Sequence, residues 1–232
     1  MKTITTYDEL SSDLINSNLT MVWKELFDMP LRHFEKINIV EGDVVECGVW
    51  KGGYLIFLSH LFQDKNIWAC DSYEGFQPID KVNYKFNGER HTPGFTHGAK
   101  GPIAISLEEV KNNFKIYNLE HERIKYLKGF VNETLPMSGI EKISLLRIDV
   151  DAYSATLEVL DNLYYKVQPG GYIIFDDLNL KESYEAIKYF LERENLPMNV
   201  YNPYTDQPYS LKHPIIDTDS GFHAGSYIIK NY

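Results

Sequence analysis

Four aspartates at the ends of two short apolar segments are the residues of this sequence best suited to bind a metal ion. The segment LLRIDVDAY contains Asp149 and Asp151, and the segment GGYIIFDDLN contains Asp176 and Asp177. Each apolar run is rich in β-branched or aromatic residues, which predicts a buried strand. Residues 153–165 lie between the two runs and are expected to form a helix, followed by a Pro-Gly-Gly turn.

This strand–helix–strand unit is expected to gather the four carboxylates at one edge of a sheet. Its strands should be parallel and joined by a right-handed crossover. Both acidic pairs then emerge at the carboxyl edge, where open α/β folds bind their ligands. Carboxylates that converge there repel one another unless a cation holds them together. The sequence therefore predicts a divalent metal site, and oxygen ligands of this kind suit Mg²⁺.

A glycine-containing turn follows the first predicted strand and indicates a nucleoside cofactor site. Strand 43–47 runs into the sequence E-C-G-V-W-K-G-G, which contains Glu46, Gly48 and Gly52. Glycines at such a turn let the backbone approach a ligand closely and open the next helix. The spacing is not the G-x-G-x-x-G fingerprint, which argues against NAD. It fits the looser turn of class I S-adenosylmethionine (SAM)-dependent methyltransferases, and a tight turn without a ligand is the alternative.

Residues after the next two predicted strands extend this cofactor site. Asp71 ends a strand over 66–70, where an acidic side chain can accept hydrogen bonds from ribose hydroxyls. The alternative for this aspartate is a helix cap. Ser72, Gly129 and Phe130 are expected to border the nucleoside, with the phenylalanine ring against the adenine or, alternatively, in the ordinary core.

The alternation of strands and helices predicts an α/β fold of the Rossmann-like class I type. We expect a mostly parallel central sheet with helices on both faces. Two closing strands, near 198–201 and 225–230, should add antiparallel character at one edge. Residues 1–40 are predicted to form a helical extension, with one long helix over 20–36, and residues 41–232 the methyltransferase domain.

Composition and charge narrow the partners that this chain can have. The formal net charge is -10, and no cluster of Lys and Arg could follow a phosphate backbone, which argues against nucleic acid. No stretch approaches the roughly 20 apolar residues of a membrane span, and the first residues carry no apolar signal core. The two cysteines fall in predicted buried strands and suit reduced thiols. We therefore expect a cytoplasmic protein that does not bind membranes, and the sequence is compatible with a homo-oligomer.

Taken together, these segments make the sequence similar to a known family of enzymes. It resembles the macrocin O-methyltransferase (TylF-like) family of Mg²⁺-dependent SAM enzymes, which act largely on sugar hydroxyls. The matching stretches occur in the family's order over roughly residues 42–190: VVECGVWKGG, IWACDSYEGF, SLEEVKNNF, KGFVNETLP, LLRIDVDAYSATLEVLDNLYYKVQPGGYIIFDDL and EAIKYF. The combination of the D-S-Y-E-G and D-x-D-x-Y motifs with the later Asp-Asp pair is specific.

The resemblance implies a role for each acidic residue. Three aspartates match the family's metal ligands, and Asp151 matches its proposed general base. Four residues lie in its SAM-binding segments: Glu46, Gly48, Asp71 and Ser72. The implied metal ligands are Asp149, Asp176 and Asp177, and Asp149 is also assigned to the cofactor site. From the residues alone, Asp151 could instead cap the following helix, and the Asp-Asp pair could be solvated turn residues.

The expected reaction is SAM- and Mg²⁺-dependent methyl transfer to a hydroxyl of a sugar or a sugar-containing small molecule. The segments 77–105 and 202–223 are rich in aromatic residues and are expected to cover the carboxyl edge and bind the acceptor. They contain His91, His97, His213 and His223, which either contact substrate or are ordinary loop residues. A metal-dependent hydrolase or phosphotransferase, or a non-catalytic SAM-binding module, are the alternative functions.

Overall fold

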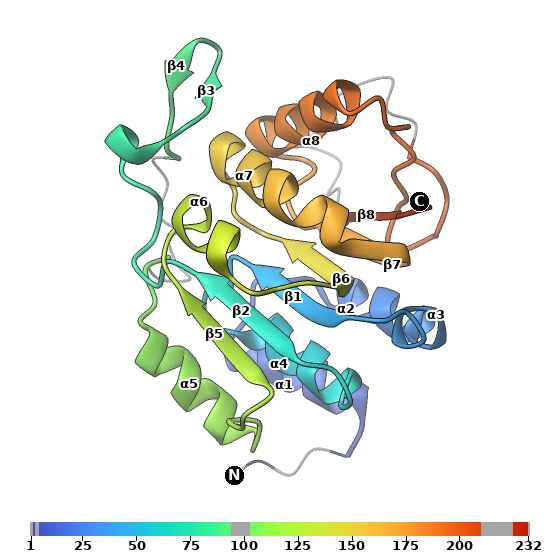
Figure 1. The fold of residues 1–232 in the computed structure, drawn as a ribbon. Helices are drawn as coiled ribbons and strands as arrows, with labels where there is room; N and C mark the ends of the chain where they lie inside the picture. The colour runs from blue at the N-terminus through green and yellow to red at the C-terminus, as the bar shows by residue number, and fades with distance from the viewer. Residues whose placement is uncertain (1, 3–4, 94–102, 210–224, 232) are drawn as a thin grey trace.

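A six-stranded sheet forms the centre of the protein, with the strand order β5-β2-β1-β6-β7-β8 (Figure 1). The computed structural model describes the whole chain except residues 1, 3–4, 94–102, 210–224 and 232. The strands of this sheet are β1 (Asp43–Cys47), β2 (Ile67–Asp71), β5 (Ile124–Lys128), β6 (Ile143–Ile148), β7 (Val167–Phe175) and β8 (Ser226–Ile229). In this order, the neighbouring strands from β5 through β2, β1 and β6 to β7 are parallel, and β8 is antiparallel to β7. The predicted mostly parallel sheet with an antiparallel edge is confirmed.

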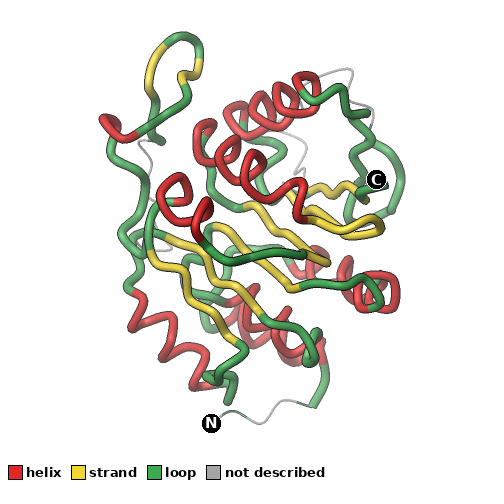
Figure 2. Tube along the Cα trace, viewed as in Figure 1, coloured by secondary structure: helices red, strands yellow, loops and turns green. Residues whose placement is uncertain are grey.

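Helices cover both faces of this sheet (Figures 1 and 2). Residues of α1, α2, α4 and α5 form a hydrophobic cluster on one face, and residues of α6, α7 and α8 form a second cluster on the other. The helices are α1 (Tyr7–Asn16), α2 (Lys24–Arg32), α3 (Phe34–Asn38), α4 (Gly53–Leu61), α5 (Leu107–Ile116), α6 (Val131–Thr134), α7 (Tyr153–Leu163) and α8 (Lys181–Arg193). The described part of the chain also contains three short 3₁₀ helices, η1 (Ile79–Lys81), η3 (Leu135–Met137) and η4 (Tyr164–Lys166).

The strand order reverses between β1 and β6, and this reversal positions the site. The helix that follows β1, α4, packs on one face of the sheet, and the helix that follows β6, α7, packs on the other. The two chain segments therefore separate at the carboxyl ends of β1 and β6. In open α/β sheets a crevice forms at such a switch point. All six residues of β6 are buried, so this strand is a rigid support for the residues that follow it.

Two local predictions were wrong, one because of a tertiary contact and the other because of a local turn. The long helix expected over 20–36 is divided into α2 and α3 at His33. The ring of this histidine contacts an Asp206 carboxylate oxygen at 3.1 Å and the Tyr172 hydroxyl at 3.2 Å. The first closing strand is only an isolated bridge at Tyr201. The chain turns directly after it, because the side-chain oxygen of Asn202 accepts hydrogen bonds from the backbone N–H groups of Tyr204 and Thr205.

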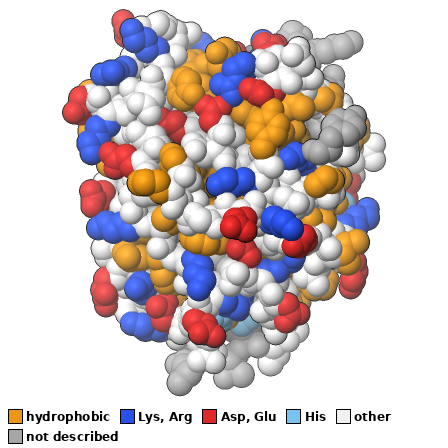
Figure 3. All heavy atoms as spheres, in the orientation of Figure 1, with side chains coloured by type: hydrophobic (Ala, Val, Ile, Leu, Met, Phe, Trp, Pro, Cys, Tyr) orange, Lys and Arg blue, Asp and Glu red, His pale blue; other side chains and the backbone are white. Residues whose placement is uncertain are grey.

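A small hairpin, β3 (Lys85–Phe86) with β4 (Glu89–Arg90), projects beyond the carboxyl edge of the sheet (Figure 1). On the face drawn in Figure 3, acidic and basic side chains are interspersed, without a continuous basic stripe. Among the described residues, no helix combines the length and apolar character that crossing a membrane requires. Residues of α1 and α2 share a hydrophobic cluster with α4, and the division of the chain at residue 40 stays a prediction.

Candidate active site

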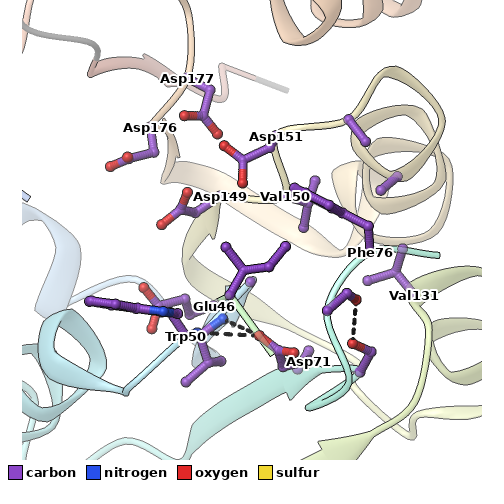
Figure 4. A pocket seen from close by; sticks show the side chains of 18 of the residues that line it. Glu46, Trp50, Asp71, Phe76, Val131, Asp149, Val150, Asp151, Asp176 and Asp177 are labelled. Carbon is purple, nitrogen blue, oxygen red and sulfur yellow. Dashed lines mark hydrogen bonds between the residues drawn. The ribbon is translucent and has the colours of Figure 1, made fainter. Parts of the chain in front are cut away.

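Three aspartates from two strand ends come together at the carboxyl edge. Asp149 and Asp151 follow β6, Asp177 follows β7, and one carboxylate oxygen from each lies within 4.8 Å of the others. Asp151 adopts the left-handed backbone region with φ 57°, which is uncommon for a residue other than glycine. This conformation belongs to a tight turn in which the Ala152 N–H donates to the Val150 carbonyl at 2.6 Å. The turn directs the Asp151 carboxylate toward that of Asp177 (Figure 4).

Asp176 points away from this group of three and contacts a buried arginine instead (Figure 4). Its Oδ1 accepts from Nη2 of Arg147 at 2.5 Å. The same Nη2 lies 2.8 Å from Oδ2 of Asp149, and Nη1 donates to Oε1 of Glu46. The guanidinium also lies over the ring of Tyr54, 4.4 Å from its centroid.

Sequence reasoning did not identify Arg147 as a site residue. It is the only charged residue of β6, and its side chain is 2% exposed. A lone arginine between Leu146 and Ile148 was the available signal, because a buried arginine requires carboxylate partners. Those partners come from β1 and from the ends of β6 and β7, and only the sheet order brings them together.

Burial and mutual repulsion alter the protonation of this acidic group. Burial raises the pKa values of Asp149 and Asp177 well above the ordinary range, against the opposing effect of Arg147. Burial also raises the pKa of Asp151 to about 6, and the nearby Asp176 carboxylate adds to the increase. A divalent cation at the group would favour the ionised forms and reverse these shifts. Oxygen donors in this number suit Mg²⁺, so the residues present fit such an ion.

The glycine turn lies directly beside the acidic group. Gly48 has φ +84°, and a Cβ at this position would lie 1.6 Å from the carbonyl oxygen of Asp149. Only glycine therefore lets the turn after β1 approach the end of β6 this closely. Gly52 has φ +85° at the start of α4, where a Cβ would meet the Phe114 ring at 3.0 Å.

Asp71 holds this turn in place through backbone hydrogen bonds. Its Oδ2 accepts from the N–H groups of Val49 at 2.7 Å and Trp50 at 3.3 Å, and its Oδ1 accepts from Tyr73 at 2.7 Å (Figure 4). Burial raises the pKa of Asp71, and these three donors oppose the shift. The neighbouring Ser72 hydroxyl donates to the Gly75 carbonyl at 2.7 Å. The pattern indicates a preformed loop whose shape depends on one carboxylate.

A cavity of about 310 Å³ joins the turn to the acidic group. Nine of the predicted site residues line it: Glu46, Gly48, Asp71, Ser72, Phe130, Asp149, Asp151, Asp176 and Asp177. Gly52 and Gly129 are not among the lining residues. Gly129 instead supports the next turn, with its N–H donating to the Asp71 carbonyl at 2.9 Å.

Segments outside the sheet also contribute to the wall of the cavity. They include residues 19–22 before α2, together with Phe76, Gln77, His91 and Ile103. His91 is therefore near the cavity, and its ring packs 6.4 Å from that of Phe86. The other histidines named from the sequence, His97, His213 and His223, lie outside the described residues.

The sheet order, the turn after the first strand and the acids at the switch point define a Rossmann-like class I SAM-dependent methyltransferase fold. A solved structure of the O-methyltransferase NovP has this fold, with a TM-score of 0.74 and 27% identity, and the match covers 92% of this chain and 82% of that one. The calicheamicin methyltransferase CalS11 shares the fold at a TM-score of 0.58 and 17% identity, covering 96% of this chain and 91% of that one.

The sequence model of the macrocin-O-methyltransferase (TylF) family matches residues 7–204. The chain therefore belongs to this family, as the resemblance predicted. It is 39% identical over 145 residues to demethyldecarbamoylnovobiocin O-methyltransferase of Streptomyces niveus, and this match covers 60% of this chain and 54% of that protein. It is 32% identical over 162 residues to mycinamicin III 3''-O-methyltransferase of Micromonospora griseorubida, and this match covers 68% of this chain and 63% of that protein. The matches thus span just over half of the length of these relatives.

Proposed function

We propose that this protein is a SAM- and Mg²⁺-dependent O-methyltransferase that methylates a hydroxyl of a sugar or a sugar-containing small molecule. The observation that carries the proposal is one cavity lined by both the glycine turn of a methyltransferase fold and a group of three convergent carboxylates. Family membership and three relatives named as O-methyltransferases support it, and the name of one of them specifies a rhamnosyl-containing acceptor.

The turn between Gly48 and Gly52 and the carboxylate of Glu46 are the proposed binding groups for SAM. Glu46 is 1% exposed and lines the cavity, and its Oε2 has no hydrogen-bond partner among the described residues. A buried carboxylate oxygen of this kind needs a donor, since leaving it unpaired is unfavourable. A bound cofactor with N–H and O–H groups would supply one.

The proposed metal ligands are Asp149, Asp176 and Asp177. Asp149 and Asp177 belong to the group within 4.8 Å, whereas Asp176 contacts Arg147 through Oδ1, which leaves Oδ2 as its atom for a cation. Mg²⁺, when bound, would supply positive charge that lowers the pKa of a nearby acceptor hydroxyl. The carboxylates of this chain hold that charge at the edge of the cavity.

Asp151 is the proposed general base. In the transfer, the acceptor oxygen forms a bond to the methyl carbon as the bond from that carbon to sulfur breaks, and the hydroxyl proton passes to Asp151. A base with a pKa of about 6 is ionised at neutral pH and can still accept this proton. The remaining contribution of the site is the alignment of oxygen, carbon and sulfur across the cavity.

Methyl transfer from labelled SAM into glycosylated acceptors, with Mg²⁺ and with chelator, tests this proposal. We expect labelled product that requires the metal. Product formed equally well in chelator would refute the metal assignment. Mg²⁺-dependent phosphate release without SAM binding would instead support the hydrolase alternative.

A further inference from the structure

Arg147 connects the two ends of the cavity through one buried side chain. Its Nη1 donates to Glu46, on the side of the glycine turn. Its Nη2 lies 2.8 Å from Asp149 and 2.5 Å from Asp176, on the side of the acidic group. The side chain is 2% exposed, so water does not screen these ion pairs effectively.

The ion pairs around Arg147 are incomplete in a way that indicates added ligands. Three carboxyl groups face one guanidinium, so acidic groups outnumber the basic group in this cluster. Nε of Arg147 and Oε2 of Glu46 are both buried, and neither has a hydrogen-bond partner among the described residues. Stable buried ion pairs normally satisfy such atoms. A cluster that lacks positive charge and retains an unpaired acceptor toward the cavity is suited to cationic ligands.

We propose that Arg147 is a positioning residue that orients Glu46 for the cofactor and is itself held by Asp149 and Asp176. The inference rests on the proposed function, because it takes Glu46 as a group that contacts SAM. It follows that a change at Asp176, which follows β7 and is therefore two strands away from the glycine turn after β1, alters the affinity for the cofactor. A guanidinium suits this role because its planar fork contacts separate carboxylates in a fixed geometry.

The test compares two neighbouring aspartates that differ in their contact with Arg147. Asp176→Asn and Asp177→Asn each replace one carboxyl group at the end of β7 by an amide, and of these two aspartates only Asp176 forms an ion pair with Arg147. The dissociation constant of S-adenosylhomocysteine is measured by calorimetry in chelator, so that metal binding does not contribute. We expect Asp176→Asn to weaken binding at least about fivefold, and Asp177→Asn to leave it unchanged within error.

Arg147→Lys is the direct variant and should weaken binding of the same probe by a similar factor. Lysine keeps the charge but lacks the fork that contacts Glu46, Asp149 and Asp176 together. Thermal unfolding of every variant separates a folding defect from an effect on binding. If the lysine variant does not fold, the two aspartate variants still decide the question.

The outcomes distinguish this inference from the proposed function. Equal effects of Asp176→Asn and Asp177→Asn, or a lower unfolding temperature of Asp176→Asn with unchanged affinity, would overturn the role of Arg147 alone. Failure of the unaltered protein to bind S-adenosylhomocysteine would overturn the proposed function and this inference with it. Selective weakening by Asp176→Asn supports both.

Discussion

The two ends of the cavity are stabilised in opposite ways. At the glycine turn, the carboxylate of Asp71 accepts three backbone hydrogen bonds and holds the loop in one shape. At the acidic group, Asp149, Asp151 and Asp177 face one another, and burial raises the pKa of each. The backbone of the turn is held in place without a ligand, whereas a cation would favour the ionised forms of the acidic group. The difference indicates that the glycine turn is preformed, whereas the acidic group beside it needs a ligand to balance its charge.

The largest expected effect separates chemistry from binding within the acidic group. Asp151→Asn should reduce methyl transfer about 10²–10⁴-fold, because the amide cannot accept the proton. The rate of the unaltered enzyme should fall with pH as Asp151 becomes protonated, at a pH below about 6 because bound Mg²⁺ would lower this pKa, and the variant should lack this decrease. Rates across pH 5–8 and binding of S-adenosylhomocysteine are the measurements. Retained turnover would remove Asp151 as the base, whereas lost binding would assign it to the cofactor.

The contact between the two ends depends on Gly48. Gly48→Ala should reduce the free energy of unfolding by at least about 3 kcal/mol, since the Cβ adds a clash with the Asp149 carbonyl to the strain of a positive φ. Gly139→Ala is the matched control, because Gly139 has φ +72° and no atom within 4 Å of the added Cβ. It should cost only about 1–2 kcal/mol. Denaturant unfolding of both variants measures the difference, and equal losses would show that the close approach is unimportant.

Removal of the acceptor at the glycine turn should weaken cofactor binding. In Asp71→Asn, an N–H group replaces one of the two acceptor oxygens, so at least one of the three backbone N–H donors loses its acceptor, at a cost of about 1–3 kcal/mol. We expect S-adenosylhomocysteine to bind roughly tenfold more weakly or worse, as calorimetry in chelator would measure. Asp43→Asn, which removes a carboxylate bonded to Trp68 and Asn66, controls for general loss of stability. Unchanged affinity in Asp71→Asn would show that the turn keeps its shape by other means.

The smallest expected effect concerns pH and stability at the acidic end. Burial raises the pKa of Glu46 to about 7 and that of Asp151 to about 6, above their ordinary values. The folded state thus binds more protons than the unfolded state between about pH 4 and pH 7, so stability without metal falls as pH rises through this range.

Mg²⁺ should therefore raise the unfolding temperature more at pH 8 than at pH 5. Scanning calorimetry at both pH values, with Mg²⁺ and with chelator, gives the comparison. Asp177→Asn should reduce the response to Mg²⁺ at pH 8. A response of equal size at both pH values would show that the ionisation of these groups is not linked to metal binding.

The sequence alone was sufficient to predict the fold and the place where the acids converge. Parallel strands end at one edge, so Asp149 and Asp177 could be placed near each other from the positions of two apolar runs. The orientation of each carboxylate could not be predicted in this way. Asp176 turns to Arg147, and that contact depends on β1, β6 and β7 lying side by side. The break between α2 and α3 has a similar cause, because Asp206 contacts His33 from 173 positions along the chain.

The close approach of Gly48 to the Asp149 carbonyl also bears on how the acceptor range of such an enzyme can change. The two groups that would align donor and acceptor are attached to adjacent, buried strands, so the separation of neighbouring strands sets the distance between them. The outer wall of the cavity comes from segments that are not part of the sheet. For the proposed methyltransferase, we expect replacement of those segments to admit a different acceptor without altering the geometry of transfer. The scaffold would then separate the choice of substrate from the reaction itself.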